Sequence, residues 1–206
     1  MKLFSSLMEE QTLLPIIQAD TVEQGVEIGK AMSIAGIGLV EVVLRTEASI
    51  DIIKTLKTEV PNLKVGAGTV VNEKAYNKAI DAGSDFIITP TSSTKLFETL
   101  AQSPVPVLPG VSDPASILLS VEFGYKELKL FPASLSGGSQ FLFAMSSIFK
   151  DISFCPTGGI TSANKHEYLN LSNVFAVGGT WVAKKEWVES KDWAKISAAC
   201  LAANQE

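Results

Sequence analysis

The segment LVEVVLRTEASIDIIKTLKTEV (residues 39–60) contains a short apolar run followed by an amphipathic stretch. Its first part, residues 39–44, is rich in Val and Leu, as strands buried on both faces of a parallel sheet are. In the second part Ile52, Leu56 and Val60 recur at intervals of four, which places them on one face of a helix. The segment therefore predicts one strand and one helix that covers it.

The same unit recurs along the chain. Eight short runs, most of them rich in Val, Ile, Leu or Phe, predict strands, and the stretches between them predict helices; the runs are residues 13–18, 39–44, 64–70, 86–90, 106–111, 127–132, 153–158 and 174–179. Helix boundaries are marked as well. Asp113 before Pro114 is typical of a helix start, and Gly83 is typical of a helix end.

Strands that alternate with helices predict an α/β fold with right-handed crossovers and a parallel sheet. A closed (β/α)8 TIM barrel fits the eight strands, and a length of 206 residues requires short loops. We expect an extra N-terminal helix before residue 13 and a single domain over residues 1–206. An open doubly wound sheet is the alternative, although no G-x-G-x-x-G motif follows the first strand.

The composition limits the classes of partner and the cellular location. Hydrophobic residues make up 46% of the chain, which disfavours disorder, and the net charge is -5 without any cluster of Lys or Arg. A nucleic-acid partner is therefore not expected. No apolar run is long enough to cross a membrane, and the N-terminus lacks the pattern of a signal peptide. Cys155 and Cys200 suit neither a disulfide framework nor a metal site, so the sequence predicts a cytoplasmic protein.

A lysine stands inside one of the predicted strands, in ELKLFP (residues 127–132). Because strand side chains alternate between two faces, Lys129 shares a face with Glu127 and Phe131, opposite the two leucines. If the leucines pack against the outer helices, Lys129 points into the barrel. Loss of hydration there favours the neutral amine, which is the form that attacks a carbonyl group. The alternative is a lysine at a strand end whose ammonium group lies in solvent or pairs with Glu41.

Charged residues also interrupt the strand predicted over residues 39–44. Glu41 and Arg45 share a face with Val43, so Glu41 would lie inside and Arg45 at the C-terminal mouth, where barrel enzymes have their active sites. An interior carboxylate that faces an interior lysine can transfer protons, and an arginine at the rim can bind a carboxylate in a bidentate manner. A structural ion pair is the alternative.

Glycine pairs end the seventh and eighth predicted strands, Gly158-Gly159 in CPTGGI and Gly178-Gly179 in AVGGTW. Loops after those strands often form the phosphate site of barrel enzymes, because glycine lets backbone N–H groups approach an anion. Simple tight turns are the alternative. Two threonines in predicted strands, Thr69 and Thr157, could each donate a hydrogen bond to a carboxylate or cap the next helix.

Six segments together resemble the 2-keto-3-deoxy-6-phosphogluconate (KDPG) and 4-hydroxy-2-oxoglutarate aldolase family. They are EVVLRT (41–46), VGAGTV (65–70), LPGVS (108–112), KELKLFPA (126–133), FCPTGGI (154–160) and AVGGTW (176–181), and their order and spacing span most of the chain. The most specific are K-x-F-P, with Lys129, Phe131 and Pro132, and the T-G-G-I that follows it.

The resemblance implies a TIM barrel, a homotrimer and a class I aldolase that needs no metal or cofactor. It implies that Lys129 forms a Schiff base with its substrate and that Glu41 transfers protons. The substrate-binding residues that it implies are Arg45, Thr69 and Thr157 for the pyruvyl carboxylate and nearby hydroxyl groups, Phe131 beside the reacting carbons, Pro90 in the lining of the site, and Gly158, Gly159, Gly178, Gly179 and Thr180 for the distal phosphate. The expected partners are small molecules, namely a phosphorylated 2-keto-3-deoxy sugar acid and pyruvate.

Two departures from the family pattern concern the distal end of the substrate. The chain has Thr89-Pro90-Thr91 where the family often has Ser-Pro-Gly, and Thr180 where the family often has serine. These departures leave three substrates open: KDPG, its phosphogalactonate epimer, and 4-hydroxy-2-oxoglutarate, which would give pyruvate and glyoxylate. A phosphate-binding barrel isomerase, epimerase or synthase, and a non-catalytic sensor of phosphorylated metabolites, are the other classes of function.

Overall fold

The computed structural model describes residues 3–205, in which short strands alternate with helices. The strands are β1 (Leu13–Ile17), β2 (Leu39–Val43), β3 (Lys64–Gly68), β4 (Ile87–Ile88), β5 (Val107–Leu108), β6 (Gly110–Val111), β7 (Glu127–Leu130), β8 (Ser153–Phe154) and β9 (Val177–Gly179). The α-helices are α1 (Val22–Ile34), α2 (Ser49–Glu59), α3 (Glu73–Asp81), α4 (Thr94–Leu100), α5 (Pro114–Glu122), α6 (Gly138–Ser146), α7 (Lys165–Leu169), α8 (Lys185–Glu189) and α9 (Trp193–Gln205).

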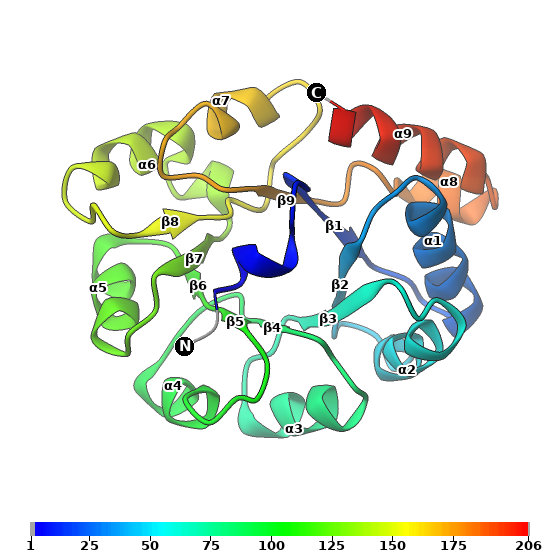
Figure 1. Cartoon of the computed structure of the whole chain (residues 1–206), viewed down its shortest axis with the longest axis horizontal. Helices are drawn as coiled ribbons and strands as arrows, with labels where there is room; N and C mark the ends of the chain where they lie inside the picture. The colour runs from blue at the N-terminus through cyan, green and yellow to red at the C-terminus, as the bar shows by residue number, and fades with distance from the viewer. Residues whose placement is uncertain (1–2, 206) are drawn as a thin grey trace.

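The strands pair in parallel and form two sheets. One sheet has the order β5-β4-β3-β2-β1-β9, and the other has the order β6-β7-β8. Isolated parallel bridges between Phe154 and Val174 and between Thr157 and Gly178 connect the segments around β8 and β9. Figure 1 shows the strands around the centre of the molecule with the helices outside them. The predicted α/β fold with parallel strands is confirmed, and the strands curve around an interior.

Local signals in the sequence explain where several helices begin and end. Asp113 caps α5 by accepting a hydrogen bond from the backbone N–H of Ser116, whose hydroxyl in turn accepts from the Asp113 N–H, and Pro114 is the first helical residue. After α3 the chain turns at Gly83, whose φ of 84° lies in the left-handed region that glycine adopts without strain. Both boundaries were predicted from the sequence. Among residues 3–205, no helix is long and apolar enough to span a membrane.

The strand side chains divide between two apolar layers. Alternate residues such as Val42 and Leu128 pack with the helices in the large outer core. The others, such as Leu39 and Phe86, belong to a smaller inner cluster. This alternation places the side chain of a charged residue at an inner position inside the ring of strands.

The N-terminal segment fills one end of this interior. A single 3-10 turn, η1 (Ser5–Leu7), crosses the centre of the ring of strands in Figure 1. Phe4 and Met8 flank the turn and are buried, and the ring of Phe4 meets that of Phe86 edge-on with centroids 5.0 Å apart. The backbone N–H of Ser5 donates to a carboxylate oxygen of Glu127 at 2.9 Å. The N-terminal helix expected before residue 13 is therefore reduced to one 3-10 turn.

The strands fall at the eight predicted positions but are shorter than predicted, and the fifth is interrupted. β5 pairs with β4, whereas β6 pairs with β7, and Pro109 lies between β5 and β6. Proline has no backbone N–H to donate, so it cannot continue the ladder. Its carbonyl instead accepts a hydrogen bond from the backbone N–H of Lys129 at 2.8 Å.

Candidate active site

Lys129 and Glu41 meet inside the ring of strands. Lys129 lies in β7 between two leucines of the outer core, so its own side chain projects inward, and Glu41 projects inward from β2 in the same way. The Nζ atom of Lys129 is 3.0 Å from Oε1 and 3.1 Å from Oε2 of Glu41. The two side chains are 5% and 0% exposed. Both residues are thus placed as their strand parity predicts.

This ion pair is almost completely removed from water. Taking an ammonium and a carboxylate out of solvent costs several kcal/mol per ion by a rough estimate, and the pairing recovers this only when the geometry is good. Here both carboxylate oxygens lie within hydrogen-bonding distance of one amine. The same Nζ lies 5.4 Å from the ring centroid of Phe131, which adds a cation–π contact on another side. The carboxylate is therefore positioned to take a proton from the amine.

Cys155, in the segment after β8, is a second nucleophilic side chain in the interior. Its side chain is fully buried in the inner cluster. Burial raises the pKa of its thiol to about 12, although the positive charge of Lys129 acts in the opposite direction. Cys155 therefore stays protonated near neutral pH and is a poor nucleophile.

A cavity of about 210 Å³ opens above the ion pair. Its wall includes Lys129 and residues from the ends of β1, β2, β7 and β9 and from the segment after β8. The lining residues are Ile16, Gln18, Val43, Arg45, Lys129, Phe131, Thr157, Gly158, Gly159, Ile160, Gly179 and Thr180. A positive side chain, two hydroxyl groups and a glycine-rich edge therefore surround the buried amine.

Most of the predicted site residues line this cavity, but four do not. Glu41 lies behind Lys129 and contacts it directly. Gly178 lies behind Thr157, because a Cβ atom at Gly178 would be only 2.4 Å from the Thr157 hydroxyl oxygen. Pro90 is half-buried, and its carbonyl carbon would be 2.3 Å from a Cβ atom at Gly110. Thr69 is also half-buried and is absent from the cavity wall.

Thr69 does not have the extended backbone conformation that regular strand alternation requires. Val65 and Ala67 belong to the outer core, so simple alternation would direct Thr69 toward the helices as well. Its φ is 61°, in the left-handed region, which is unusual for a β-branched residue. Alternation along β3 therefore stops at Gly68, and a role for Thr69 stays a prediction.

The glycine pair after β8 has a conformation that most other residues would resist. Gly158 and Gly159 have φ values of 92° and 80°. A Cβ atom at Gly159 would also lie 2.2 Å from the hydroxyl oxygen of Ser134. Gly178 and Gly179 instead lie within β9, and a Cβ atom at Gly179 would meet the ring of Trp181 at 2.0 Å. Of the four glycines, Gly158, Gly159 and Gly179 line the cavity and leave backbone without side chains along one of its edges, which suits an anion site.

Comparison with known proteins places this geometry in a family. A model described as "Aldolase: KDPG and KHG aldolase" matches residues 4–199. The chain belongs to this family. The 2-dehydro-3-deoxy-phosphogluconate aldolase of Pseudoalteromonas atlantica is 40% identical over 185 residues, which are 90% of this chain and 86% of that protein.

Two solved structures of KDPG aldolases are similar over nearly the whole chain. The enzyme from Legionella pneumophila, with pyruvate captured at low pH as a covalent carbinolamine intermediate, has a TM-score of 0.94 at 33% identity and covers 97% of both chains. The enzyme from Zymomonas mobilis ZM4, with 3-phosphoglycerate, has a TM-score of 0.90 at 35% identity and covers 97% of this chain and 93% of the other. Both the sequence and the fold therefore show that the chain belongs to the KDPG and KHG aldolase family.

Several lining residues of this family member were not predicted from its sequence. Ile16 and Gln18 come from the end of β1 and share the parity of Leu14, which lies in the inner cluster. Val43 shares the inner face of β2 with Glu41. The strand parity of Ile16, Gln18 and Val43 places them on the inner face, but their residue types do not indicate a functional site.

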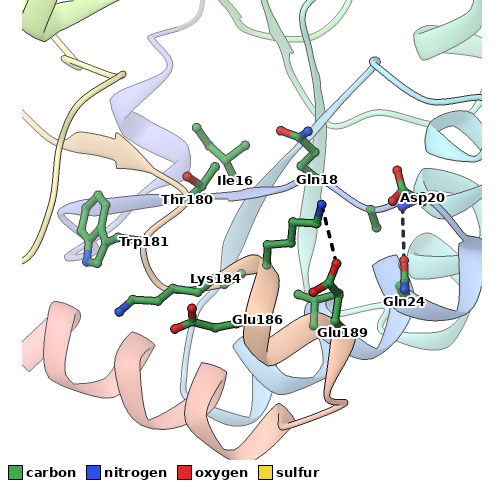
Figure 2. A pocket seen from close by; sticks show the side chains of 13 residues that line it. Ile16, Gln18, Asp20, Gln24, Thr180, Trp181, Lys184, Glu186 and Glu189 are labelled. Atoms are coloured by element: carbon green, nitrogen blue, oxygen red, sulfur yellow. Dashed lines mark hydrogen bonds and ion pairs between the residues drawn. The ribbon is translucent and has the colours of Figure 1, made fainter.

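A second, larger cavity of about 570 Å³ adjoins the first, and the two share Ile16, Gln18 and Thr180. Figure 2 shows Gln18 and Thr180 above α8, with acidic and basic side chains of α8 and the preceding loop below them. An ion pair across 3.6 Å joins Lys185 to Glu189 within α8. The charged side chains that line this cavity are exposed and of both signs, and no buried amine is among them, so we place the chemistry in the smaller cavity.

No group of three or more His, Cys, Asp or Glu side chains within residues 3–205 is arranged to hold a metal ion.

Proposed function

We propose that the chain is a class I aldolase that cleaves KDPG to pyruvate and glyceraldehyde 3-phosphate through a Schiff base on Lys129. The observation that carries this proposal is the buried contact of 3.0 Å between the Lys129 amine and the Glu41 carboxylate beneath the cavity. Family membership supports it. The covalent pyruvate adduct in the Legionella pneumophila relative supports an amine nucleophile.

The reaction begins when Lys129 transfers a proton to Glu41 and the neutral amine attacks the C2 ketone of the substrate. Loss of water gives a protonated imine, which accepts electrons. Removal of the C4 hydroxyl proton then forms the aldehyde C=O bond and breaks the C3–C4 bond, whose electron pair becomes the C2=C3 bond of an enamine as the C=N π pair moves to the nitrogen. The aldehyde leaves, C3 of the enamine is protonated, and water hydrolyses the imine to pyruvate and free Lys129.

Glu41 is the proposed proton carrier in these steps, directly or through water. A positioned acid–base group contributes roughly 10²–10⁴-fold to such a reaction. Arg45 would bind the pyruvyl carboxylate at the rim, with Thr157 and Thr69 beside the carboxylate and nearby hydroxyl groups. Phe131 would pack against the reacting carbons, and Pro90 would help to shape that wall.

The phosphate would bind along the glycine edge formed by Gly158, Gly159, Gly178 and Gly179, with the hydroxyl group of Thr180. The left-handed conformation of the first two glycines is compatible with backbone N–H groups that converge on an anion. The 3-phosphoglycerate in the Zymomonas mobilis relative supports a phosphorylated substrate. We further propose a side activity on 4-hydroxy-2-oxoglutarate, which the family description supports, and we hold the phosphogalactonate epimer as the alternative substrate.

The proposed enzyme is a single domain over residues 1–206, built as a closed (β/α)8 barrel. The two sheets would complete the ring through the bridges beside β8 and β9 and through the adjacent strands β5 and β6. We also propose a cytoplasmic homotrimer. Large apolar side chains are exposed on neighbouring elements, namely Leu118 and Val121 on α5, Leu135 in the 3-10 turn η2 (Ala133–Leu135), Phe143 on α6 and Ile148 after it. Such a surface is typical of a subunit contact, and light scattering of the purified protein tests it.

Trapping with borohydride tests the proposed chemistry. Incubation with pyruvate and borohydride should add a pyruvate-derived mass to the peptide that contains Lys129, and Lys129→Met should abolish the adduct. A wild-type protein that releases no pyruvate from KDPG and forms no adduct would exclude the aldolase and leave a phosphate-binding isomerase or epimerase. A panel of KDPG, its phosphogalactonate epimer and 4-hydroxy-2-oxoglutarate then identifies the substrate through pyruvate release.

A further inference from the structure

We propose that Gly68 is a positioning residue for Glu41, because its missing side chain provides the space in which the Glu41 carboxylate lies. This inference rests on the proposed role of Glu41 in proton transfer. It concerns a residue that does not line the cavity.

The register of the strands places Gly68 beside β2. β2 and β3 pair in parallel, and Val43 lies opposite Gly68. Val65 and Ala67 of β3 pack in the outer core, so Gly66 and Gly68 occupy the inner positions of the same strand. Lys64, the first residue of β3, has the same parity, and its amine bonds to the carbonyl of Leu7. At the next two inner positions, Gly66 and Gly68, β3 presents bare backbone to the interior.

Different side chains occupy the space beside the two glycines. A Cβ atom at Gly68 would be 1.9 Å from Oε1, 2.6 Å from Cδ and 2.7 Å from Cγ of Glu41. A Cβ atom at Gly66 would be 2.1 Å from two ring carbons of Phe86. The two spaces thus hold two different neighbours, a catalytic candidate at Gly68 and an apolar ring at Gly66.

Apart from Gly68, little fixes the position of the Glu41 carboxylate on the side that faces β3. Within residues 3–205 its hydrogen bonds are to the Lys129 amine alone. A carboxylate can accept more bonds than these, so its lateral position depends on steric contact with the strand beside it. Since non-bonded heavy atoms prefer separations of roughly 3.5 Å, an added methyl group would displace the carboxylate by more than about 1 Å.

A displacement of this size matters for the chemistry. A misplacement of about 1 Å in a catalytic geometry can reduce turnover roughly 100-fold. Gly68→Ala keeps the Lys129 amine, so long incubation with pyruvate should still accumulate the imine, although the proton transfers that involve Glu41 should all be slow. The expected result is a kcat reduced about 100-fold with little change in KM.

The experiment compares Gly68→Ala with Gly66→Ala, which adds the same methyl group at the other inner position of β3 but meets Phe86 instead of Glu41. Three measurements are made per folded molecule: trapping of pyruvate at Lys129, exchange of the pyruvate methyl protons with deuterated water, and kcat and KM for KDPG. Gly68→Ala should keep trapping and lose exchange and kcat. Gly66→Ala should lower the unfolding temperature and keep exchange and kcat close to wild type.

A double variant separates positioning from general damage. If Gly68→Ala acts by moving Glu41, then Glu41→Gln should reduce kcat much less in the Gly68→Ala background than in the wild type. Equal effects in both backgrounds, or a Gly68→Ala enzyme with wild-type exchange and kcat, would overturn the proposal.

Two measurements keep the proposal testable if Gly68→Ala folds poorly or if the aldolase function is wrong. Gly68→Ala should shift the urea midpoint strongly in the wild type and far less in Glu41→Ala, where the space is empty; equal shifts would mean that the methyl group meets something else. A crystal structure of Gly68→Ala should show the Lys129–Glu41 distance lengthened beyond hydrogen-bonding range. An unchanged distance would refute the positioning role even if the wild type never forms an imine.

Discussion

Removing one partner of the Lys129–Glu41 pair should destabilise the protein far more than removing both. The pair is almost fully buried. Lys129→Met leaves the Glu41 carboxylate without its counterion, and Glu41→Leu leaves the ammonium group without a partner. Breaking a buried pair in this way costs about 3–5 kcal/mol, whereas replacing both partners by apolar residues is often neutral or stabilising by about 1–4 kcal/mol. The double variant Lys129→Met/Glu41→Leu should therefore recover at least wild-type stability.

An exposed pair on the same protein provides the control. Lys30 and Glu59 approach to 2.8 Å, which is closer than the buried pair, but their side chains are 38% and 46% exposed. Solvent screening limits such a pair to about 1 kcal/mol or less. Lys30→Met and Glu59→Leu should thus have small and nearly additive effects. The comparison decides whether burial or distance sets the energy.

Equilibrium unfolding in urea, followed by circular dichroism, measures the free energy of unfolding for the four proteins of each cycle. We expect a large, non-additive coupling for Lys129 and Glu41 and a coupling near zero for Lys30 and Glu59. The reasoning is refuted if each single substitution at the buried pair lowers the free energy of unfolding by less than about 1 kcal/mol. It is also refuted if the double variant loses as much stability as the two single variants added together. Under the proposed mechanism the stable double variant should also be inactive, because it lacks both Lys129 and Glu41.

Three further predictions concern other parts of the chain. Burial raises the pKa of the Cys155 and Cys200 thiols to about 12, so neither should react with a thiol reagent at neutral pH until the protein is unfolded; a reactive thiol in the native protein would contradict this. Asp113→Ala should cost about 1 kcal/mol of unfolding free energy through loss of the α5 cap. Because the N–H of Ser116 lowers the pKa of Asp113, this contribution is present above the unfolded pKa of about 3.9 and is lost as the pH falls through the folded value, which urea unfolding at several pH values measures. Gly159→Ala should raise KM for KDPG roughly 10-fold and leave KM for 4-hydroxy-2-oxoglutarate unchanged, as steady-state kinetics would show.

The positions of the strands could be predicted because most strand residues are buried on both faces, so that most of the strands lie in short runs rich in apolar residues. Their lengths could not, because pairing depends on neighbours that are distant in the sequence. The run over residues 106–111 contains Pro109, and the strand divides there into a part that pairs with β4 and a part that pairs with β7. A proline inside a run signals such a break, but the two partners are a property of the whole ring.

The N-terminal segment was predicted as a helix and forms a single turn because tertiary contacts decide its shape. Phe4 and Met8 insert into the inner cluster, and the Ser5 N–H bonds to Glu127. A short segment of this kind has little intrinsic helical stability, so burial of two side chains on either side of the turn outweighs it. The sequence shows the apolar residues but not the interior that receives them.

The candidate site contains residues within strands, whose direction follows from alternation, and residues beyond the strand ends, whose direction depends on the loops. Lys129 and Glu41 lie in the middle of strands, where alternation is reliable, and the structure brings them together. Thr69 lies one residue beyond β3 with a φ of 61°, so its parity gave no guide to its direction. Gln18 lies one residue beyond β1 and lines both cavities, but nothing in the composition of that segment marked it.

Two acidic residues show why a charged residue inside a strand does not by itself indicate catalysis. Glu127 and Glu41 are both buried at inner positions, one at the start of β7 and the other at the middle of β2. Glu127 accepts a hydrogen bond from the N-terminal turn, at the end of the interior that Phe4 closes. Glu41 pairs with an amine that lines an open cavity. Depth along the strand separates the two residues: Glu127, at the amino end of β7, bonds to the N-terminal turn, whereas Glu41, farther along β2, lies beside an amine that lines a cavity at the carboxyl ends, the end at which barrel enzymes have their active sites.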